Sequence, residues 1–253
     1  MNGVDISHYQ KGLTIRQIKE AGKEFAILKL TEGARLVDSA AFSFYREAYE
    51  LDFPVGCYCY SHALNEEQAA AEAAFLLGTL RGFPMPCGVF LDVEETEQLA
   101  LTHERLLAVV RAWCAGIRAG GYTPGVYDSA GTLWAKLSPD ELPPGCLVWV
   151  AKWGGVPPNT PCDLWQTGDS GHIEGYSGCV DTDRTGSERF AELVKGGSPT
   201  KPHAAATAGP DPTVMVLQLL MRCSGCWDTT DGMPSAAFFS ALRAFTDRLE
   251  ADR

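Results

Sequence analysis

The sequence predicts a closed α/β barrel followed by a small helical segment, and three observations carry this prediction. Short apolar runs alternate with amphipathic segments of helical length through the first half of the chain, which is the pattern of a parallel sheet. Eight such runs precede a stretch rich in glycine, proline and alanine. Acidic residues stand at the ends of several runs, where barrel enzymes carry their functional groups. The alternative is an open doubly wound sheet, but the glycine-rich loop expected after its first strand is missing.

Five strand–helix units are expected first. Thr14 and Gln17 form a capping box that opens the first helix, and Gly22 closes it. Three later strands have no long helical pattern between them, so the count is five βα units plus three strands of a TIM-like barrel. The expected strands are 3–8, 25–30, 55–60, 88–96, 125–127, 146–153, 163–166 and 178–181. The expected helices are 14–22, 39–52, 65–80, 102–120 and 133–137.

The chain of 253 residues has room for one large domain and a small appendage. We expect the barrel at 1–194, a linker at 195–212 and two amphipathic helices within 213–253. About forty residues is near the limit for independent folding. We therefore expect this last segment to dock on another part of the protein, to dimerise or to be held by a cross-link. Cys223 and Cys226 have the spacing of a disulfide or a metal pair, but ordinary thiols are favoured because a second ligand pair is missing.

Composition excludes several classes of function. The formal net charge of −11 argues against nucleic-acid binding, and no apolar run approaches the roughly 20 residues of a membrane span. The first strand begins at Gly3, which leaves no room for a signal peptide, so synthesis in a cytoplasm is expected. Nine cysteines is an odd number, and Cys57 and Cys59 sit in an apolar strand, as reduced thiols do. We expect no cofactor and no metal.

The run at 88–96 is apolar and ends abruptly in carboxylates. Strand side chains alternate, so Asp92 and Glu94 should share one face, roughly 6–7 Å apart, while Glu95 points to the other face. Two such carboxylates repel, which raises one pKa. Glycoside hydrolysis needs this asymmetry, with one carboxyl group to protonate a leaving oxygen and another to stabilise positive charge on the sugar. The alternative is a carboxylate that only caps the next helix.

Other strand ends carry further candidates. In a closed barrel the first and eighth strands are neighbours, so Asp5 and Asp181 should meet at the mouth, facing Asp92 and Glu94. Aromatic side chains near strand ends suit stacking on sugar rings, although many such residues are simply core. The expected substrate-binding residues are Tyr58, Tyr60, Glu32, Tyr127, Trp149, Trp165, Gln166 and Asp183.

Six ordered motifs resemble glycoside hydrolase family 25, the Chalaropsis-type muramidases common among phage endolysins. The resemblance covers about residues 1–190. Its motifs are Gly3-Val4-Asp5-Ile6-Ser7-His8-Tyr9-Gln10, Lys29-Leu30-Thr31-Glu32-Gly33, Gly56-Cys57-Tyr58-Cys59-Tyr60-Ser61, Leu91-Asp92-Val93-Glu94, Trp165-Gln166 and Val180-Asp181-Thr182-Asp183. Two positions depart from the family pattern: many members have His at Cys59, and Asn or another residue at Asp183.

The resemblance implies a flattened barrel that cleaves the β-1,4 bond between N-acetylmuramic acid and N-acetylglucosamine of bacterial peptidoglycan. It also implies that Glu94 is the general acid and Asp92 its partner, while Asp5 and Asp181 bind substrate and tune the pair. A phage enzyme of this kind would wait in the host cytoplasm and act on the wall after release. The C-terminal helices would bind the wall or form a homodimer. The competing interpretation is a non-catalytic peptidoglycan-binding protein on the same barrel.

Overall fold

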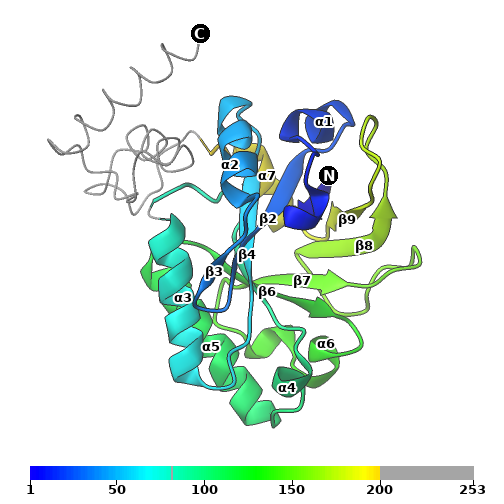
Figure 1. The fold of residues 1–253 in the computed structure, drawn as a ribbon. Coiled ribbons are helices and arrows are strands. Elements are labelled where there is room, and N and C mark those ends of the chain that lie inside the picture. Colours follow the sequence, from blue (N-terminus) through cyan, green and yellow to red (C-terminus); the bar gives the residue numbers. More distant parts are fainter. Residues whose placement is uncertain (81, 200–253) are drawn as a thin grey trace, which may run out of the picture. The chain divides into compact units, whose positions relative to one another are not determined.

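The computed structural model describes residues 1–80 and 82–199, and their strands form one sheet that closes into a barrel (Figure 1). The strand order is β1-β9-β8-β7-β6-β5-β4-β2-β3, and an additional β1–β2 pairing closes eight of the strands, leaving β3 outside as an extra edge strand. The strands are β1 (Asn2–Ile6), β2 (Phe25–Glu32), β3 (Leu36–Val37), β4 (Val55–Tyr60), β5 (Val89–Asp92), β6 (Pro124–Ser129), β7 (Leu147–Ala151), β8 (Leu164–Gly171) and β9 (Val180–Thr185).

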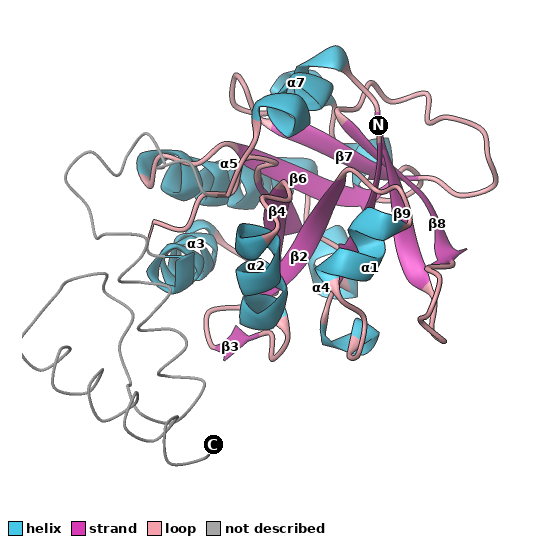
Figure 2. Ribbon diagram, turned by 90° about the horizontal axis from the view of Figure 1, so that it is seen from above, coloured by secondary structure: helices cyan, strands magenta, loops and turns pink. Residues whose placement is uncertain are grey.

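Helices lie outside the strands, as Figure 2 shows for α2, α3 and α5. The α-helices of the described residues are α1 (Ile15–Glu20), α2 (Ala41–Glu50), α3 (Glu66–Leu80), α4 (Thr96–Leu99), α5 (His103–Ala119), α6 (Leu133–Lys136) and α7 (Glu188–Gly196). The predicted capping box is present: Thr14 accepts a hydrogen bond from the Gln17 amide, and the Gln17 side chain accepts one from the Thr14 amide. Helix α7 was not predicted, and it runs two residues into the segment expected to be a linker.

The direction of the strands follows from what connects them. β1, β2, β4, β5, β6, β7 and β8 pair in parallel, whereas β9 is antiparallel to both β8 and β1. Residues 172–179 connect β8 to β9 without a helix. A parallel pairing needs a long crossover, so the short connection here gives the antiparallel one. The predicted fold class, with five βα units and three further strands, is confirmed.

Large aromatic side chains fill the interior of the barrel, beginning with Phe25 at the start of β2. Phe25, Phe90 and Trp149 belong to one buried cluster. Two glycines make room for these rings: a Cβ atom at Gly3 would lie 2.4 Å from the Phe25 ring, and one at Gly125 would lie 2.3 Å from the Phe90 ring. Small residues opposite large ones are how narrow barrels fill their interior. The opposite end, where the parallel strands finish, is left for polar side chains.

The chain divides into two compact units, of which the first comprises 1–79 and 84–201 and contains the barrel. Nearly all of the second unit falls outside the described residues, as do most of the predicted linker, the predicted C-terminal helices, Cys223 and Cys226. Among the described residues, no helix has the length and apolar character needed to cross a membrane.

Candidate active site

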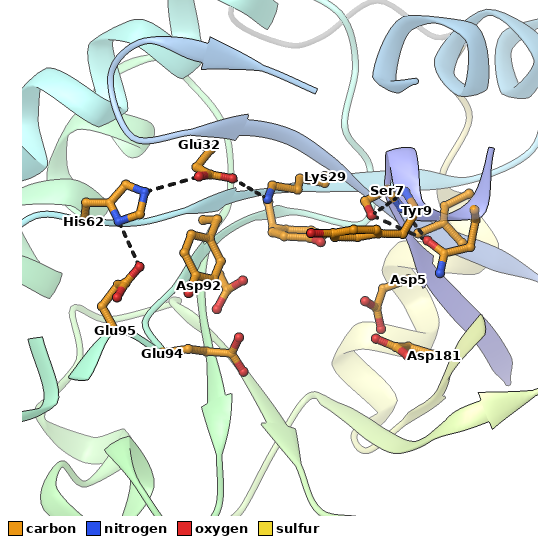
Figure 3. A pocket seen from close by; sticks show the side chains of 14 residues that line it. Asp5, Ser7, Tyr9, Lys29, Glu32, His62, Asp92, Glu94, Glu95 and Asp181 are labelled. Atoms are coloured by element: carbon orange, nitrogen blue, oxygen red, sulfur yellow. Dashed lines mark hydrogen bonds and ion pairs between the residues drawn. The ribbon is translucent and has the colours of Figure 1, made fainter. Parts of the chain in front are cut away.

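A pocket of about 500 Å³ opens where β1, β2, β4 and β5 end and β9 begins (Figure 3). Seven residues that the sequence nominated line it, and they come from five different strands or strand ends. They are Asp5, Glu32, Tyr58, Tyr60, Asp92, Glu94 and Asp181. The parallel strands carry six of them to one end of the barrel, as expected for functional groups on this fold, and Asp181 meets them there because it lies at the start of the antiparallel β9.

Asp92 and Glu94 both reach the pocket, although they do not lie on one strand face as predicted. β5 ends at Asp92, and Glu94 follows in an irregular segment. The prediction that Glu95 points away was wrong, because Glu95 also lines the pocket. Strict alternation of side chains holds only while the backbone stays in the sheet. Leaving the strand lets Glu94 extend into the open part of the pocket.

The two carboxylates differ in their surroundings. Asp92 is 4% exposed, and its Oδ1 atom has no hydrogen-bond partner among the described residues. Burial, reinforced by the charge of Glu94, raises the pKa of Asp92 well above its usual value. Partial burial raises the pKa of Glu94 to about 6, with help from the charges of Asp128 and Asp181. The sequence predicted that repulsion between Asp92 and Glu94 would raise one of the two pKa values, whereas the charges that raise the pKa of Glu94 most are those of Asp128 and Asp181.

Asp5 and Asp181 face each other across the barrel seam. They are directly paired in the antiparallel register of β1 and β9, which places both side chains on the inner face. Gln166 from β8 donates from Nε2 to Asp5 Oδ2 at 2.9 Å and to Asp181 Oδ2 at 3.4 Å. Burial raises the pKa of Asp5 well above its usual value, and the charges of Asp183 and Asp181 add to this rise. Burial also raises the pKa of Asp181.

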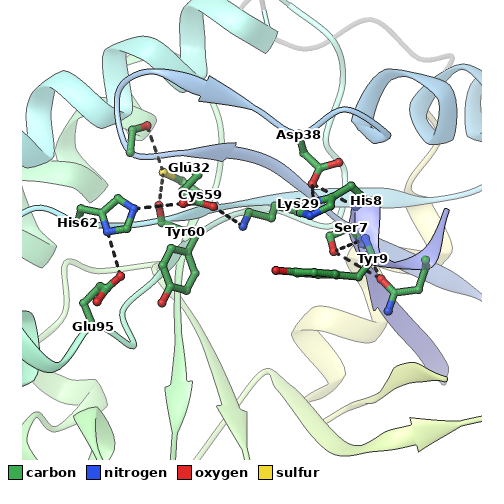
Figure 4. A network of polar contacts seen from close by, with 12 residues as sticks. Ser7, His8, Tyr9, Lys29, Glu32, Asp38, Cys59, Tyr60, His62 and Glu95 are labelled. Atoms are coloured by element: carbon green, nitrogen blue, oxygen red, sulfur yellow. Dashed lines mark hydrogen bonds and ion pairs between the residues drawn. The ribbon is translucent and has the colours of Figure 1, made fainter. Parts of the chain in front are cut away.

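Opposite this seam, charged side chains of both signs alternate along the rim (Figure 4). Lys29 Nζ lies 2.7 Å from Glu32 Oε2, and His62 bridges two acids, with Nε2 at 3.4 Å from Glu32 Oε1 and Nδ1 at 3.0 Å from Glu95 Oε1. The Lys29 ammonium also lies 4.9 Å from the centre of the Tyr60 ring. The hydrogen bond from Lys29 lowers the pKa of Glu32, which therefore stays ionised.

Five residues nominated for substrate binding do not line the pocket and are buried. They are Tyr127, Trp149, Trp165, Gln166 and Asp183. Two hydrogen bonds join four of them behind the carboxylates: the Tyr127 hydroxyl donates to Gln166 Oε1 at 3.0 Å, and Trp149 Nε1 donates to Asp183 Oδ1 at 3.0 Å. Burial raises the pKa of Asp183 to about 8. These side chains therefore lie near the carboxylates, as Gln166 does beside Asp5 and Asp181, but they are not open to the pocket.

Other pocket residues were not among the site residues expected from the sequence, although Tyr9 and Lys29 stand in the motifs quoted above. Lys29, His62, Glu95 and Tyr9 all line the pocket, and Tyr9 is 78% exposed. Lys29 did carry a signal, because a lysine inside an apolar strand is rarely buried without a partner. His62 and Glu95 lie just past the ends of β4 and β5, in irregular backbone whose direction no periodicity reports.

Neither a metal cluster nor a disulfide is found in the part of the chain that the structure describes. No group of three or more His, Cys, Asp or Glu side chains there is arranged to hold a metal ion. The cysteines of this part are free thiols, namely Cys57, Cys59, Cys87, Cys114, Cys146, Cys162 and Cys179. The chemistry of the pocket is that of carboxylates, a lysine, a histidine and tyrosines.

Comparison with known proteins finds two lysozymes that are similar to this chain in sequence. The chain is 29% identical over 187 residues to the autolytic lysozyme of Clostridium acetobutylicum, covering 72% of the chain but 55% of the relative, so it spans about half of that protein's length. It is 26% identical over 200 residues to lysozyme M1 of Streptomyces globisporus, covering 73% of the chain and 67% of the relative.

The fold is also that of a solved endolysin domain. The structure superposes on the catalytic domain of endolysin ply40 from bacteriophage P40 of Listeria monocytogenes with a TM-score of 0.66, at 23% identity, covering 78% of this chain and 97% of that one. Residues 4–176 match the model of glycosyl hydrolases family 25, and this match includes every pocket residue except Asp181. The chain therefore belongs to glycosyl hydrolase family 25.

Proposed function

We propose that this protein is an N-acetylmuramidase, which hydrolyses the β-1,4 bond between N-acetylmuramic acid and N-acetylglucosamine in bacterial peptidoglycan. Family membership and relatives named lysozyme support the reaction class. The observation that carries the proposal is the carboxylate pair. Glu94 reaches the open pocket with a pKa of about 6, beside a buried Asp92. A carboxyl group with a pKa near neutrality can hold a proton until a leaving group needs it.

Glu94 is the general acid in this proposal. Its carboxyl proton passes to the glycosidic oxygen while the bond from that oxygen to C1 of muramic acid breaks, and the glucosamine leaves with a free 4-hydroxyl group. The resulting carboxylate then takes a proton from the water that attacks C1. This exchange requires contact with the substrate, which the exposed position of Glu94 allows.

In this proposal Asp92 supplies negative charge at the reacting carbon. Because burial raises the pKa of Asp92 as well as that of Glu94, this role requires that Glu94, and not Asp92, holds the proton when substrate is bound. Two routes share this requirement: direct bonding of Asp92 to C1, or stabilisation of the oxazolinium that the neighbouring N-acetyl group forms. Asp5 and Asp181, on β1 and β9, bind sugar hydroxyl and amide groups. The charge of Asp181 also helps to raise the pKa of Glu94. Tyr58, Tyr60 and Tyr9 offer ring faces and hydroxyl groups to the glycan.

We also propose that the enzyme acts at the bacterial wall as an endolysin, held in the host cytoplasm until release. Residues 213–253 would then bind the wall or pair two copies of the chain. Light scattering on the full chain and on a chain ending at residue 199, combined with sedimentation on purified walls, separates these two roles. Loss of dimer mass in the shorter chain indicates pairing, and loss of co-sedimentation indicates wall binding.

Mass analysis of the fragments from digested cell walls tests the reaction. New reducing ends on muramic acid are the expected result. Reducing ends on glucosamine would make the protein a glucosaminidase, and no new ends with retained wall binding would make it a non-catalytic peptidoglycan-binding protein. The Glu94→Gln variant is the inactive control for this digestion, because glutamine keeps the shape of the side chain but has no acidic proton to transfer.

A further inference from the structure

A second hollow, of about 520 Å³, lies beside the candidate active site between the β2–β3 hairpin and α3. We call it the hairpin groove. Glu32 and His62 line both the groove and the active-site pocket, and the contact between His62 Nε2 and Glu32 Oε1 stands between the two spaces. Both side chains are partly exposed, so a ligand in the pocket can continue across this pair into the groove. Figure 4 shows the pair at the end of the charged rim.

The groove has a different chemistry from the pocket. No aromatic residue other than His62 lines it, whereas the pocket has three tyrosines. Ala34, Leu36 and Ala71 give it small apolar surfaces, and Leu36 is 60% exposed. Sugar rings are generally held by aromatic faces and fixed polar groups, so this lining does not suit another sugar. It suits small aliphatic side chains.

One cation in the groove is available to a ligand. Arg35 is exposed, and its side chain forms no ion pair or hydrogen bond with any residue in 1–80 or 82–199. The acids beside it already have partners: Glu32 is paired with Lys29 and His62, and Glu72 accepts hydrogen bonds from the Ser61 hydroxyl at 2.6 Å and the His62 amide at 2.9 Å. An arginine fork binds a carboxylate well.

We propose that the hairpin groove binds the peptide that peptidoglycan carries on its muramic acid, with Arg35 pairing to a carboxylate of that peptide. This inference rests on the proposed function. The peptide is attached to the sugar that the pocket would hold, it is rich in alanine, and it carries carboxylate groups. Small apolar surfaces beside an available arginine, next to the catalytic pocket, match these three properties.

Two soluble substrates test the groove: uncrosslinked glycan strands with intact peptides, and the same strands after an amidase has removed the peptides. We expect Arg35→Glu to lower kcat/KM on peptide-bearing strands about tenfold, while its activity on stripped strands stays within about twofold of the wild type. The control is Arg46→Ala, on the exposed face of α2, which should change neither. Equal loss on both substrates, or no loss on either, would overturn the proposal.

A binding measurement separates the groove from the reaction. The free pentapeptide L-Ala-γ-D-Glu-L-Lys-D-Ala-D-Ala is titrated into the full chain, and the amide resonances of residues 34–36 are followed by NMR. These resonances should shift in the wild type and stay in place in Arg35→Glu. No shift in the wild type at millimolar peptide would refute the groove. A shift in a protein that cleaves neither substrate would refute the proposed reaction and leave the groove standing.

Discussion

The two walls of the pocket hold carboxylates in opposite ways. On the β1–β9 wall, Asp5 and Asp181 pack against each other and the neutral donor Gln166, and no cation of residues 1–80 or 82–199 forms an ion pair with them. On the β2–β5 wall, Lys29 and His62 are interleaved with Glu32 and Glu95. On the first wall, burial without an ion-pair partner among the described residues raises the pKa values of Asp5 and Asp181. On the second wall, the Lys29 ammonium lowers the pKa of Glu32.

Asp92 and Glu94 belong to the second wall but differ in their exposure. The charge of Lys29 opposes the rise in the pKa of both residues without cancelling it. Asp92 is buried and its Oδ1 atom lacks a partner within the described chain, whereas Glu94 is exposed to the pocket. A proton that must reach a substrate is best carried by the accessible group. This contrast assigns proton transfer to Glu94 and charge stabilisation to its neighbour.

The largest expected effect comes from Glu94→Gln. General acid catalysis contributes about 10²–10⁴-fold, so we expect kcat on purified walls to fall about a thousandfold. The fold should be unchanged by circular dichroism, because the side chain is exposed. The matched control is Glu97→Gln on the exposed face of α4, which should keep full activity. Near-wild-type clearing of walls by Glu94→Gln would remove this residue from the role of acid.

Asp92→Asn should reduce activity about a hundredfold without lowering stability. The amide cannot stabilise positive charge at the sugar, but it also replaces a buried carboxyl group whose Oδ1 atom has no partner in the described part of the chain. The free energy of unfolding, measured in urea, should therefore stay constant or rise by about 1 kcal/mol. Asp5→Asn is the comparison on the other wall, with a smaller loss of activity of about tenfold. A larger loss for Asp5 than for Asp92 would reverse the assignment of the two walls.

The pH dependence of kcat/KM should show an alkaline limb near pH 6. Glu94 must carry a proton to act, and its pKa is raised to about 6, so the active form is lost as the pH rises through that value. Each further pH unit should then cost about tenfold in kcat/KM on a soluble substrate. A limb near pH 4.5, the usual value for glutamate, would mean that the pocket does not perturb this group.

Asp183→Asn should reduce the pH dependence of stability. The native pKa of Asp183 is about 8, above its value in the unfolded chain, so the native state binds the extra proton. Stability is therefore lost as the pH rises from about 4 through 8. The variant should melt several degrees higher than the wild type at pH 8 and nearly equally at pH 4, since about 1 kcal/mol shifts Tm by 2–4 °C at this size. An equal shift at both pH values would contradict the linkage.

The smallest expected effect is that of His62→Gln. Half-exposed ion pairs contribute about 0.2–1 kcal/mol, so unfolding should be almost unaffected. Activity should fall a few-fold, because the imidazole of His62 no longer connects Glu95 to Glu32 and Glu95 lies next to the general acid Glu94. His172→Gln, in an exposed loop, is the control. A loss as large as that of Glu94→Gln would place His62 in the chemistry itself.

The sequence by itself determined the order of elements and the acids at strand ends. Strand and helix periods, the Thr14 capping box and the abrupt end of the apolar run before Asp92 are local features, and the fold follows them closely. Closure of the barrel then made the meeting of Asp5 and Asp181 predictable, because the first and last strands must be neighbours.

Only the tertiary structure decided which side chains line the pocket. Gln166 and Trp149 are buried and do not line it, whereas Lys29, His62 and Glu95 do. Their positions depend on strand ends, a register shift after Lys29 and irregular backbone beyond β4 and β5. The pKa of Glu94 likewise depends on Asp128 and Asp181, which are distant in sequence. Burial and charge proximity are properties of the closed barrel, so no local pattern encodes them.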